Sequence, residues 1–190
     1  MIYILYDTAL NGLYTLMLLQ KTYPANQSLF KGTKDENLSD VAPYIFAVDD
    51  KLFEKIDDPF ASLEEIVIVE SDEKISDLTV HFQQFIYQKI KGQENYFRFW
   101  DARVLQRFLP ASTDEKLNSF FDGIKNYYVL DRTNATAKRF FIKRGKLQTD
   151  LLPLDKLFYL SAEEELEVQH ETAGNAENAE PKKTKRKFFK

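Results

Sequence analysis

The stretch "ENYFRFWDARVLQRFL" (94–109) combines aromatic and aliphatic side chains with three arginines and one aspartate. In an extended chain its first half would place Phe97 and Phe99 on one face and Arg98 on the opposite face. Its second half has apolar residues at the spacing of an amphipathic helix. We therefore predict a strand over 96–100 that leads into a short helix.

The charged residues of this stretch fit an active site, a buried clamp or a surface that binds another protein. If Arg98 is buried it must be paired, because an unpaired buried charge costs on the order of several kcal/mol. Asp101 is a local acceptor and can also cap the following helix. Arg103 and Arg107 lie one turn apart on a shared helix face. We interpret Arg98, Asp101 and Arg103 as a structural clamp rather than catalytic groups, since ion-pair networks often imitate active sites. Recognition of a partner's carboxylates stays open.

Three further segments, 2–6, 44–48 and 65–69, have the composition of strands. The run at 65–69 is almost continuously β-branched, which is typical of a strand buried on both faces. Helical patterns lie between these segments. Strands that alternate with helices predict an α/β fold with a mainly parallel central sheet and flanking helices.

The character of the sequence changes after residue 130. The segments 126–130 and 138–144 predict an antiparallel hairpin, and a helical pattern follows it. Hydrophobic residues then become rare, which indicates a mobile segment. We predict an α/β domain over 1–130, a β-hairpin and helix extension over 131–168, and a mobile charged tail over 169–190.

The chain has 190 residues, a formal net charge of −4 and no cysteine. The lack of cysteine excludes disulfides, thiolate metal sites and a cysteine nucleophile. No stretch reaches the roughly 18–20 apolar residues of a membrane span, and the apolar start lacks the basic residues of a signal peptide. We expect a soluble, cytoplasmic, bacterial protein that binds no membrane. The slightly acidic composition also makes nucleic acid an unfavoured partner.

The set of possible catalytic residues is small. The sequence has two histidines, of which His81 falls within an amphipathic helical pattern and is expected to pack or to form a hydrogen bond. No G-x-S-x-G motif is present, and the glycines match neither a P-loop nor a dinucleotide-binding fingerprint. We therefore expect no enzymatic activity, no bound metal and no cofactor.

One pattern supports a competing hypothesis. An acid follows each predicted strand, namely Asp7, Asp49, Glu70 and Asp101. In an open parallel sheet such carboxylates converge, and they could hold Mg²⁺ for a phosphoesterase or nuclease. An acid at a strand exit more often caps the next helix, which is the interpretation we favour. The hypothesis requires at least three of these carboxylates around one point.

The end of the chain, "KKTKRKFFK" (182–190), is basic and contains two aromatic residues. It could contact nucleic acid, an anionic membrane or an acidic partner. We favour a solvated tail that balances the preceding glutamates, because charge-rich tails are commonly disordered.

Five segments occur in an order that is typical of one family. They are "YILYDTA" (3–9), "SLFKGTKDENLSDVAPYIFAVD" (28–49), "ESDEKISDLTVHFQQFI" (70–86), "YFRFWDARVL" (96–105) and "LNSFFDGIKNYYV" (117–129). Together they resemble the type VI secretion effector-adaptor family, also called effector chaperones. The most specific piece, "FRFWDARVL", is close to the family pattern R-F-x-D-P-R-V-L, with Ala102 in place of the proline.

This resemblance implies a non-enzymatic adaptor that binds a cognate toxin effector. Such a protein helps to load the effector onto the VgrG or PAAR spike protein of the secretion machine. For the partner surface we predict exposed aromatic residues of the C-terminal hairpin, because a strand pair often buries only one face. The candidates are Tyr127, Tyr128, Phe140 and Phe141.

Overall fold

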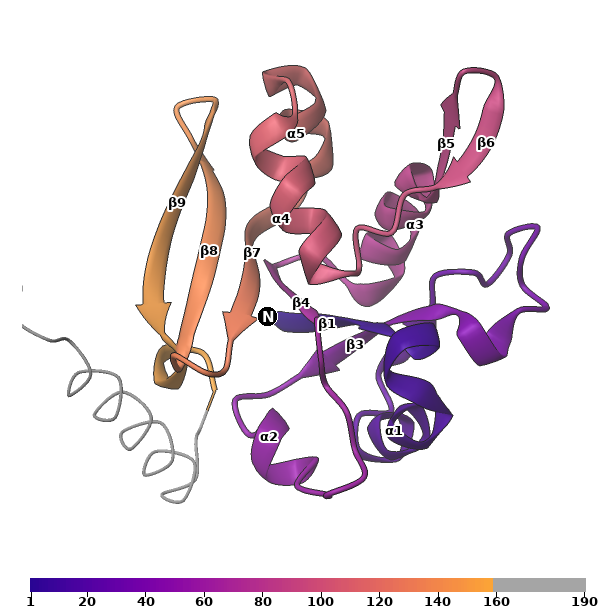
Figure 1. Cartoon of the computed structure of the whole chain (residues 1–190), viewed down its shortest axis with the longest axis vertical. Coiled ribbons are helices and arrows are strands. Elements are labelled where there is room, and N and C mark those ends of the chain that lie inside the picture. Colours follow the sequence, from indigo (N-terminus) through magenta and orange to yellow (C-terminus); the bar gives the residue numbers. More distant parts are fainter. Residues whose placement is uncertain (159–190) are drawn as a thin grey trace, which may run out of the picture.

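The computed structural model describes residues 1–158, which form a central sheet with helices on both of its faces (Figure 1). The strand order of this seven-stranded sheet is β2-β3-β1-β4-β7-β8-β9. Its members are β1 (Ile2–Asp7), β2 (Asn26–Ser28), β3 (Pro43–Val48), β4 (Val67–Ser71), β7 (Ile124–Asp131), β8 (Thr136–Lys143) and β9 (Lys146–Pro153). A separate hairpin consists of β5 (Tyr87–Ile90) and β6 (Gln93–Tyr96).

The helices are short and lie between the strands in the chain. They are α1 (Thr8–Thr22), α2 (Leu52–Lys55), α3 (Ile75–Ile86), α4 (Ala102–Ala111) and α5 (Asp114–Phe120). Single 3-10 turns occur at η1 (Ser39–Val41) and η2 (Leu154–Lys156). Within residues 1–158, no helix combines the length and the apolar character that crossing a bilayer requires.

All strand pairings of the central sheet are antiparallel, so the prediction of a mainly parallel sheet is wrong. The alternation of strands and helices is present, but two of the connections contain other segments in addition to a single helix. From β1 to β3 the chain passes through α1, β2 and a loop over 29–42. From β4 to β7 it passes through α3, the β5–β6 hairpin, α4 and α5. These additional segments reverse the chain, and the strand that follows them enters the sheet from the opposite end.

Strand β4 explains why the sequence pattern suggested parallel strands. Val67, Ile68 and Val69 are completely buried, as expected for a strand covered on both faces, although the strand begins at Val67 and not at residue 65. A continuous β-branched run reports burial on both faces, and this property is common in parallel sheets. Here two layers of helices produce the same burial around an antiparallel sheet.

Each face of the sheet has its own core. Tyr3 and Leu5 of β1 point to the face that is covered by α3, α4 and α5. Ile4 and Tyr6 point to the opposite face, which is covered by α1, α2 and the turn at Leu154. Figure 1 shows these two helical layers on opposite sides of the strands. Because successive side chains of a strand alternate between faces, β1 is buried on both sides.

The prediction of a strand over 96–100 is wrong except at its first residue. Tyr96 ends β6, and residues 97–101 form an irregular segment before α4. Phe99 and Trp100 follow one another in sequence and are both buried, so this segment has no alternating faces.

Aromatic packing explains the density of rings in this segment. The Phe99 ring stacks on Phe82 of α3, with ring centroids 5.2 Å apart. It also meets Phe120 of α5 edge-on at 5.6 Å and Trp100 at 5.1 Å. The segment thus joins α3 to α5 through buried side chains, without strand hydrogen bonds.

The C-terminal strands confirm the predicted antiparallel hairpin. Strand β7 pairs with β8, and β7 also pairs with β4, so the hairpin continues the central sheet. Of the helical pattern predicted after the hairpin, Leu154–Lys156 form the 3-10 turn η2, residues 157–158 are not helical, and the part from residue 159 onward lies outside the described residues. The predicted tail over 169–190, including the basic segment 182–190, also lies outside them.

The substitution Phe99→Ala tests the aromatic core, with Phe60→Ala as a matched control. Phe99 has no exposed surface, whereas Phe60 is 82% exposed. We expect F99A to lower the free energy of unfolding by about 3–5 kcal/mol because it leaves a cavity. We expect F60A to change it by less than about 0.5 kcal/mol. Urea denaturation of both variants measures these values, and similar losses in the two would contradict the assignment of Phe99 to the core.

Candidate functional site

The segment after β6 brings Arg98 to the carboxylate of Asp7. The Asp7 side chain is almost completely buried and caps α1 by accepting a hydrogen bond from the backbone N–H of Ala9 at 3.1 Å. It also forms an ion pair with the Arg98 guanidinium, 91 positions away in the chain. This pair ties the start of α1 to the segment between β6 and α4.

A second ion pair lies within that segment. Asp101 caps α4, as predicted, by accepting a hydrogen bond from the backbone N–H of Arg103 at 3.0 Å. The Arg103 side chain donates to both carboxylate oxygens of Asp101, at 3.0 and 2.8 Å. Burial alone would raise the pKa of Asp101, but the hydrogen bonds and charge of Arg103 outweigh it and lower that pKa. The ion pairs Asp7–Arg98 and Asp101–Arg103 therefore lie at the starts of two helices, α1 and α4.

Asp7 and Glu70 lie at opposite ends of the central sheet. In the antiparallel register Asp7 is opposite Pro43, at the start of β3, while Glu70 is opposite Ile2, at the start of β1. At about 3.3 Å per residue, the five steps along β1 separate these ends by about 17 Å. Strands β3 and β4 both run antiparallel to β1, and Val48 and Glu70 are both opposite Ile2. Asp49 and Glu70 therefore share one end of the sheet while Asp7 lies at the other, so these three carboxylates do not surround one point.

The other predicted acids have structural partners of their own. Asp49 accepts a hydrogen bond from the Tyr23 hydroxyl at 3.0 Å, and Glu70 accepts one from Tyr128 at 2.6 Å. Asp101 is engaged by Arg103. Within residues 1–158, no group of three or more histidine, cysteine, aspartate or glutamate side chains is arranged to hold a metal ion. The described residues do not fit the Mg²⁺ site that the competing hypothesis requires.

His81 is hydrogen bonded, as expected from its helical setting. Its Nε2 lies 3.1 Å from the carbonyl oxygen of Phe120, and its ring packs on Phe82 and Phe85. Burial lowers the pKa of His81, against smaller opposing effects of the Phe120 carbonyl and Asp122. These contacts connect α3 to the end of α5.

Three of the four aromatic residues predicted as a partner surface are buried. Tyr127 and Phe140 have no exposed surface, and Tyr128 is 4% exposed. The expectation of one solvent-exposed hairpin face fails because β7 and β8 belong to a sheet that is covered on both faces. Only Phe141 is partly exposed, and its ring lies 4.6 Å from the guanidinium of Arg139.

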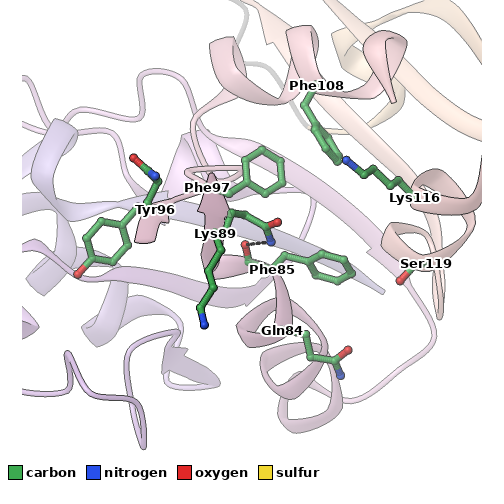
Figure 2. A pocket seen from close by; sticks show the side chains of 10 residues that line it. Gln84, Phe85, Lys89, Tyr96, Phe97, Phe108, Lys116 and Ser119 are labelled. Atoms are coloured by element: carbon green, nitrogen blue, oxygen red, sulfur yellow. Dashed lines mark hydrogen bonds between the residues drawn. The ribbon is translucent and has the colours of Figure 1, made fainter. Parts of the chain in front are cut away.

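An open groove lies between α3, the β5–β6 hairpin, α4 and α5 (Figure 2). Its volume is about 610 Å³, and all of its lining residues fall between positions 84 and 119. We call it the aromatic groove because three half-buried rings line it, the groove phenylalanines Phe85, Phe97 and Phe108. Figure 2 shows these rings approaching one another from three different elements.

The buried ring of Phe120 supports the groove phenylalanines. Its centroid lies 5.1 Å from that of Phe85, 6.1 Å from that of Phe97 and 5.3 Å from that of Phe108. The rings of Phe97 and Phe108 also contact each other, with centroids 4.4 Å apart. The floor of the aromatic groove is therefore a direct extension of the hydrophobic core.

The rim of the aromatic groove is polar and positively charged. It carries the amide side chains of Gln84, Gln88 and Asn95, the hydroxyl of Ser119, and two ammonium groups, the groove lysines Lys89 and Lys116. Figure 2 shows Lys116 extending from α5 toward Phe108, while Lys89 comes from the hairpin. This combination of apolar floor and hydrogen-bonding rim is suited to binding a polypeptide segment.

One carboxylate anchors the hairpin wall of the groove. Asp35 accepts hydrogen bonds from the hydroxyls of Tyr87 and Tyr96, both at 2.7 Å. These bonds lower the pKa of Asp35, and the bond to Asp35 raises the pKa of Tyr96 to about 12. An ion pair between Lys34 and Glu94 links the same loop to the hairpin. Tyr96 is thereby fixed at the edge of the aromatic groove.

A second exposed apolar surface lies on α1. Leu10, Leu13, Tyr14 and Met17 are between 36% and 68% exposed. Leu13, Tyr14 and Met17 share one face of the helix, and Leu10 precedes a kink at Gly12, whose φ of 83° is not helical. We call these four residues the α1 stripe. It belongs to the helical layer on the face of the sheet opposite the aromatic groove.

Comparison with known proteins gives one match. Residues 2–119 match the model of a family described as Domain of unknown function (DUF4123). No curated protein and no solved structure matches the chain. The matched region contains both ion pairs and every residue that lines the aromatic groove.

The substitution Asp101→Ala tests the second ion pair through pH. We expect it to cost about 1–2 kcal/mol of stability near pH 7, because it removes a helix cap and charged hydrogen bonds. The lowered pKa of Asp101 means that its contribution is present above the ordinary carboxyl pKa of about 3.9 and is lost as the pH falls through the folded-state value. The stability difference between the wild type and D101A should therefore shrink below about pH 4.

Urea denaturation at several pH values measures this difference. Asp57→Ala is the matched control, since Asp57 is exposed, and it should have little effect at any pH. A D101A deficit that stays constant down to about pH 2 would show that the carboxylate is not the stabilising group.

The substitution Asp35→Ala tests the anchor of the hairpin wall. We expect faster amide hydrogen exchange in β5 and β6, because Tyr87 and Tyr96 lose their shared acceptor. Global stability should fall by only about 1 kcal/mol. Hydrogen exchange measured by mass spectrometry distinguishes local opening of the hairpin from a loss of global stability. Asp40→Ala is the control, because Asp40 is exposed. Unchanged exchange in the hairpin of D35A would argue against this anchor.

Proposed function

This chain belongs to the DUF4123 family, a domain family of unknown function, and we propose that it is a non-enzymatic adaptor for type VI secretion. In this proposal the protein binds a cognate toxin effector and helps to load it onto a VgrG or PAAR spike protein. The resemblance of "FRFWDARVL" and the accompanying segments to effector adaptors supports the assignment. The structural observation that carries it is the aromatic groove, because its whole lining falls within the family-matched residues.

The chemistry of the groove favours a polypeptide as ligand. Partly exposed aromatic rings retain apolar surface that a partner can remove from water. Aromatic residues, phenylalanine included, are enriched in the interfaces of protein complexes, where a few well-packed residues carry most of the binding free energy. The amide groups of the rim can form hydrogen bonds with a peptide backbone. A groove of this composition therefore suits the binding step that an adaptor performs.

The competing hydrolase is not supported by the arrangement of its acids. Asp7 and Glu70 lie at opposite ends of the sheet, and Asp49 and Asp101 are bound by other side chains. A metal-dependent phosphoesterase needs carboxylates around one point, so we do not propose this function.

Affinity purification tests the adaptor proposal directly. The tagged full chain is expressed in a bacterium with an active type VI secretion system, and bound proteins are identified by mass spectrometry. We expect to recover a toxin effector, alone or with a VgrG or PAAR protein. Recovery of none of these from cells that produce all of them would refute the adaptor proposal.

The substitution Ser119→Trp tests whether the aromatic groove is used. Ser119 is exposed at the rim, and a bulky indole should occupy the space between α3 and α5. We expect recovery of the effector to fall about tenfold, which corresponds to about 1.4 kcal/mol. Ser76→Trp is the matched control, because Ser76 is also an exposed helical serine but lies outside the groove. Equal recovery by both folded variants would place effector binding elsewhere.

A further inference from the structure

The charge and the apolar surface of the aromatic groove together specify the chemistry of its ligand. Resting on the adaptor function proposed above, we propose that the groove binds a short effector segment that combines apolar side chains with carboxylates. The apolar side chains pack on the groove phenylalanines, and the carboxylates lie beside the groove lysines. The segment is thus both hydrophobic and acidic.

Charge complementarity is the first argument. The lining of the aromatic groove contains the ammonium groups of Lys89 and Lys116 and no aspartate or glutamate. This local excess of positive charge occurs in a chain whose formal net charge is −4. Opposite charges steer a ligand toward a surface and suppress binding of basic competitors. A carboxylate-bearing segment is therefore favoured over a basic one.

Both groove lysines are available for a ligand. Within residues 1–158, neither ammonium group forms an ion pair. The nearby acid of the hairpin, Glu94, is already paired with Lys34 of the loop before β3. Binding a carboxylate at Lys89 or Lys116 would therefore break no existing salt bridge of the described residues.

The apolar floor supplies the second requirement. Phe97 and Phe108 contact each other, and all three groove phenylalanines rest on Phe120. These rings are already positioned, so a ligand side chain that packs on them does not have to order them first. An aromatic or branched aliphatic side chain gains most from such a surface.

The size of the groove limits the ligand to a short segment. Its volume of about 610 Å³ lies within the range of about 300–1,000 Å³ that is typical of small-ligand clefts. The groove can therefore hold a few side chains, whereas a folded domain would have to bind mainly around it. We accordingly assign the ligand as a linear segment of the effector.

Site-specific photocrosslinking identifies the segment. A photoreactive phenylalanine analogue replaces Gln84 or Asn95, both exposed at the groove rim, in the full-length chain. The same analogue at Met17 of the α1 stripe is the control, because Met17 is 68% exposed on the other side of the sheet. The variants are expressed and crosslinked by light in the same bacterium that is used for the affinity purification. The crosslinked effector peptide is then identified by mass spectrometry.

The expected result is that both rim positions crosslink to one effector segment that contains apolar and acidic residues. A basic or wholly polar segment at both positions would overturn the proposed ligand chemistry while leaving the adaptor function intact. Crosslinks from Met17 alone, with normal recovery of the effector, would overturn the choice of surface. Failure to purify any effector or spike protein would instead refute the adaptor function itself.

A charge reversal tests the electrostatic part independently. The variant K89E/K116E should bind the purified effector at least about tenfold more weakly. The control K21E/K143E makes the same change in net charge at exposed positions outside the groove and should bind normally. Raising the ionic strength from about 0.1 M to about 1 M should weaken wild-type binding, because the Debye length falls from about 10 Å to about 3 Å. Equal affinities of the two folded variants would refute a role for the groove lysines.

Discussion

Burial of the middle strands β1 and β4 on both faces of the sheet is the constraint on which the rest of the structure depends. It removes every side chain of β1 between Tyr3 and Tyr6 from water, and their polar atoms must then find partners inside the protein. The Tyr3 hydroxyl donates to the carbonyl of Glu73 at 2.6 Å, and the Tyr6 hydroxyl donates to that of Gly12 at 2.7 Å. The same requirement holds for Asp7, whose carboxylate is satisfied by the start of α1 and by Arg98.

The same constraint produces the aromatic groove. The chain between β4 and β7 must cover one face of the sheet, and α3, α4 and α5 do so around Phe82, Phe99 and Phe120. These rings fill the space next to the sheet. The groove phenylalanines form the next layer outward, where the β5–β6 hairpin and the helices no longer enclose them completely. The aromatic groove is therefore the outer edge of the core.

Features that depend on residues close together in the chain could be predicted from the sequence. They include most of β1, β3 and β4, the hairpin of β7 and β8, and the cap at Asp101. Strand direction could not be predicted, because hydrophobicity reports burial and says nothing about which end of the sheet the chain enters. The partner of Arg98 was equally inaccessible, because Asp7 is 91 positions away and Asp101 is the closer acid in sequence.

The aromatic groove shows a related limit of sequence analysis. Periodicity assigns each phenylalanine to a face of its own element, and a residue that packs against a neighbouring element looks the same as one that is half exposed. Tyr127 and Phe140, predicted as partner residues because a strand pair often buries only one face, are buried, whereas the half-buried Phe85 and Phe108 line the groove. The buried rings differ from the groove rings in how many other side chains and elements cover them. That number depends on how α3, α4, α5 and the β5–β6 hairpin pack, and it becomes visible only in the assembled fold.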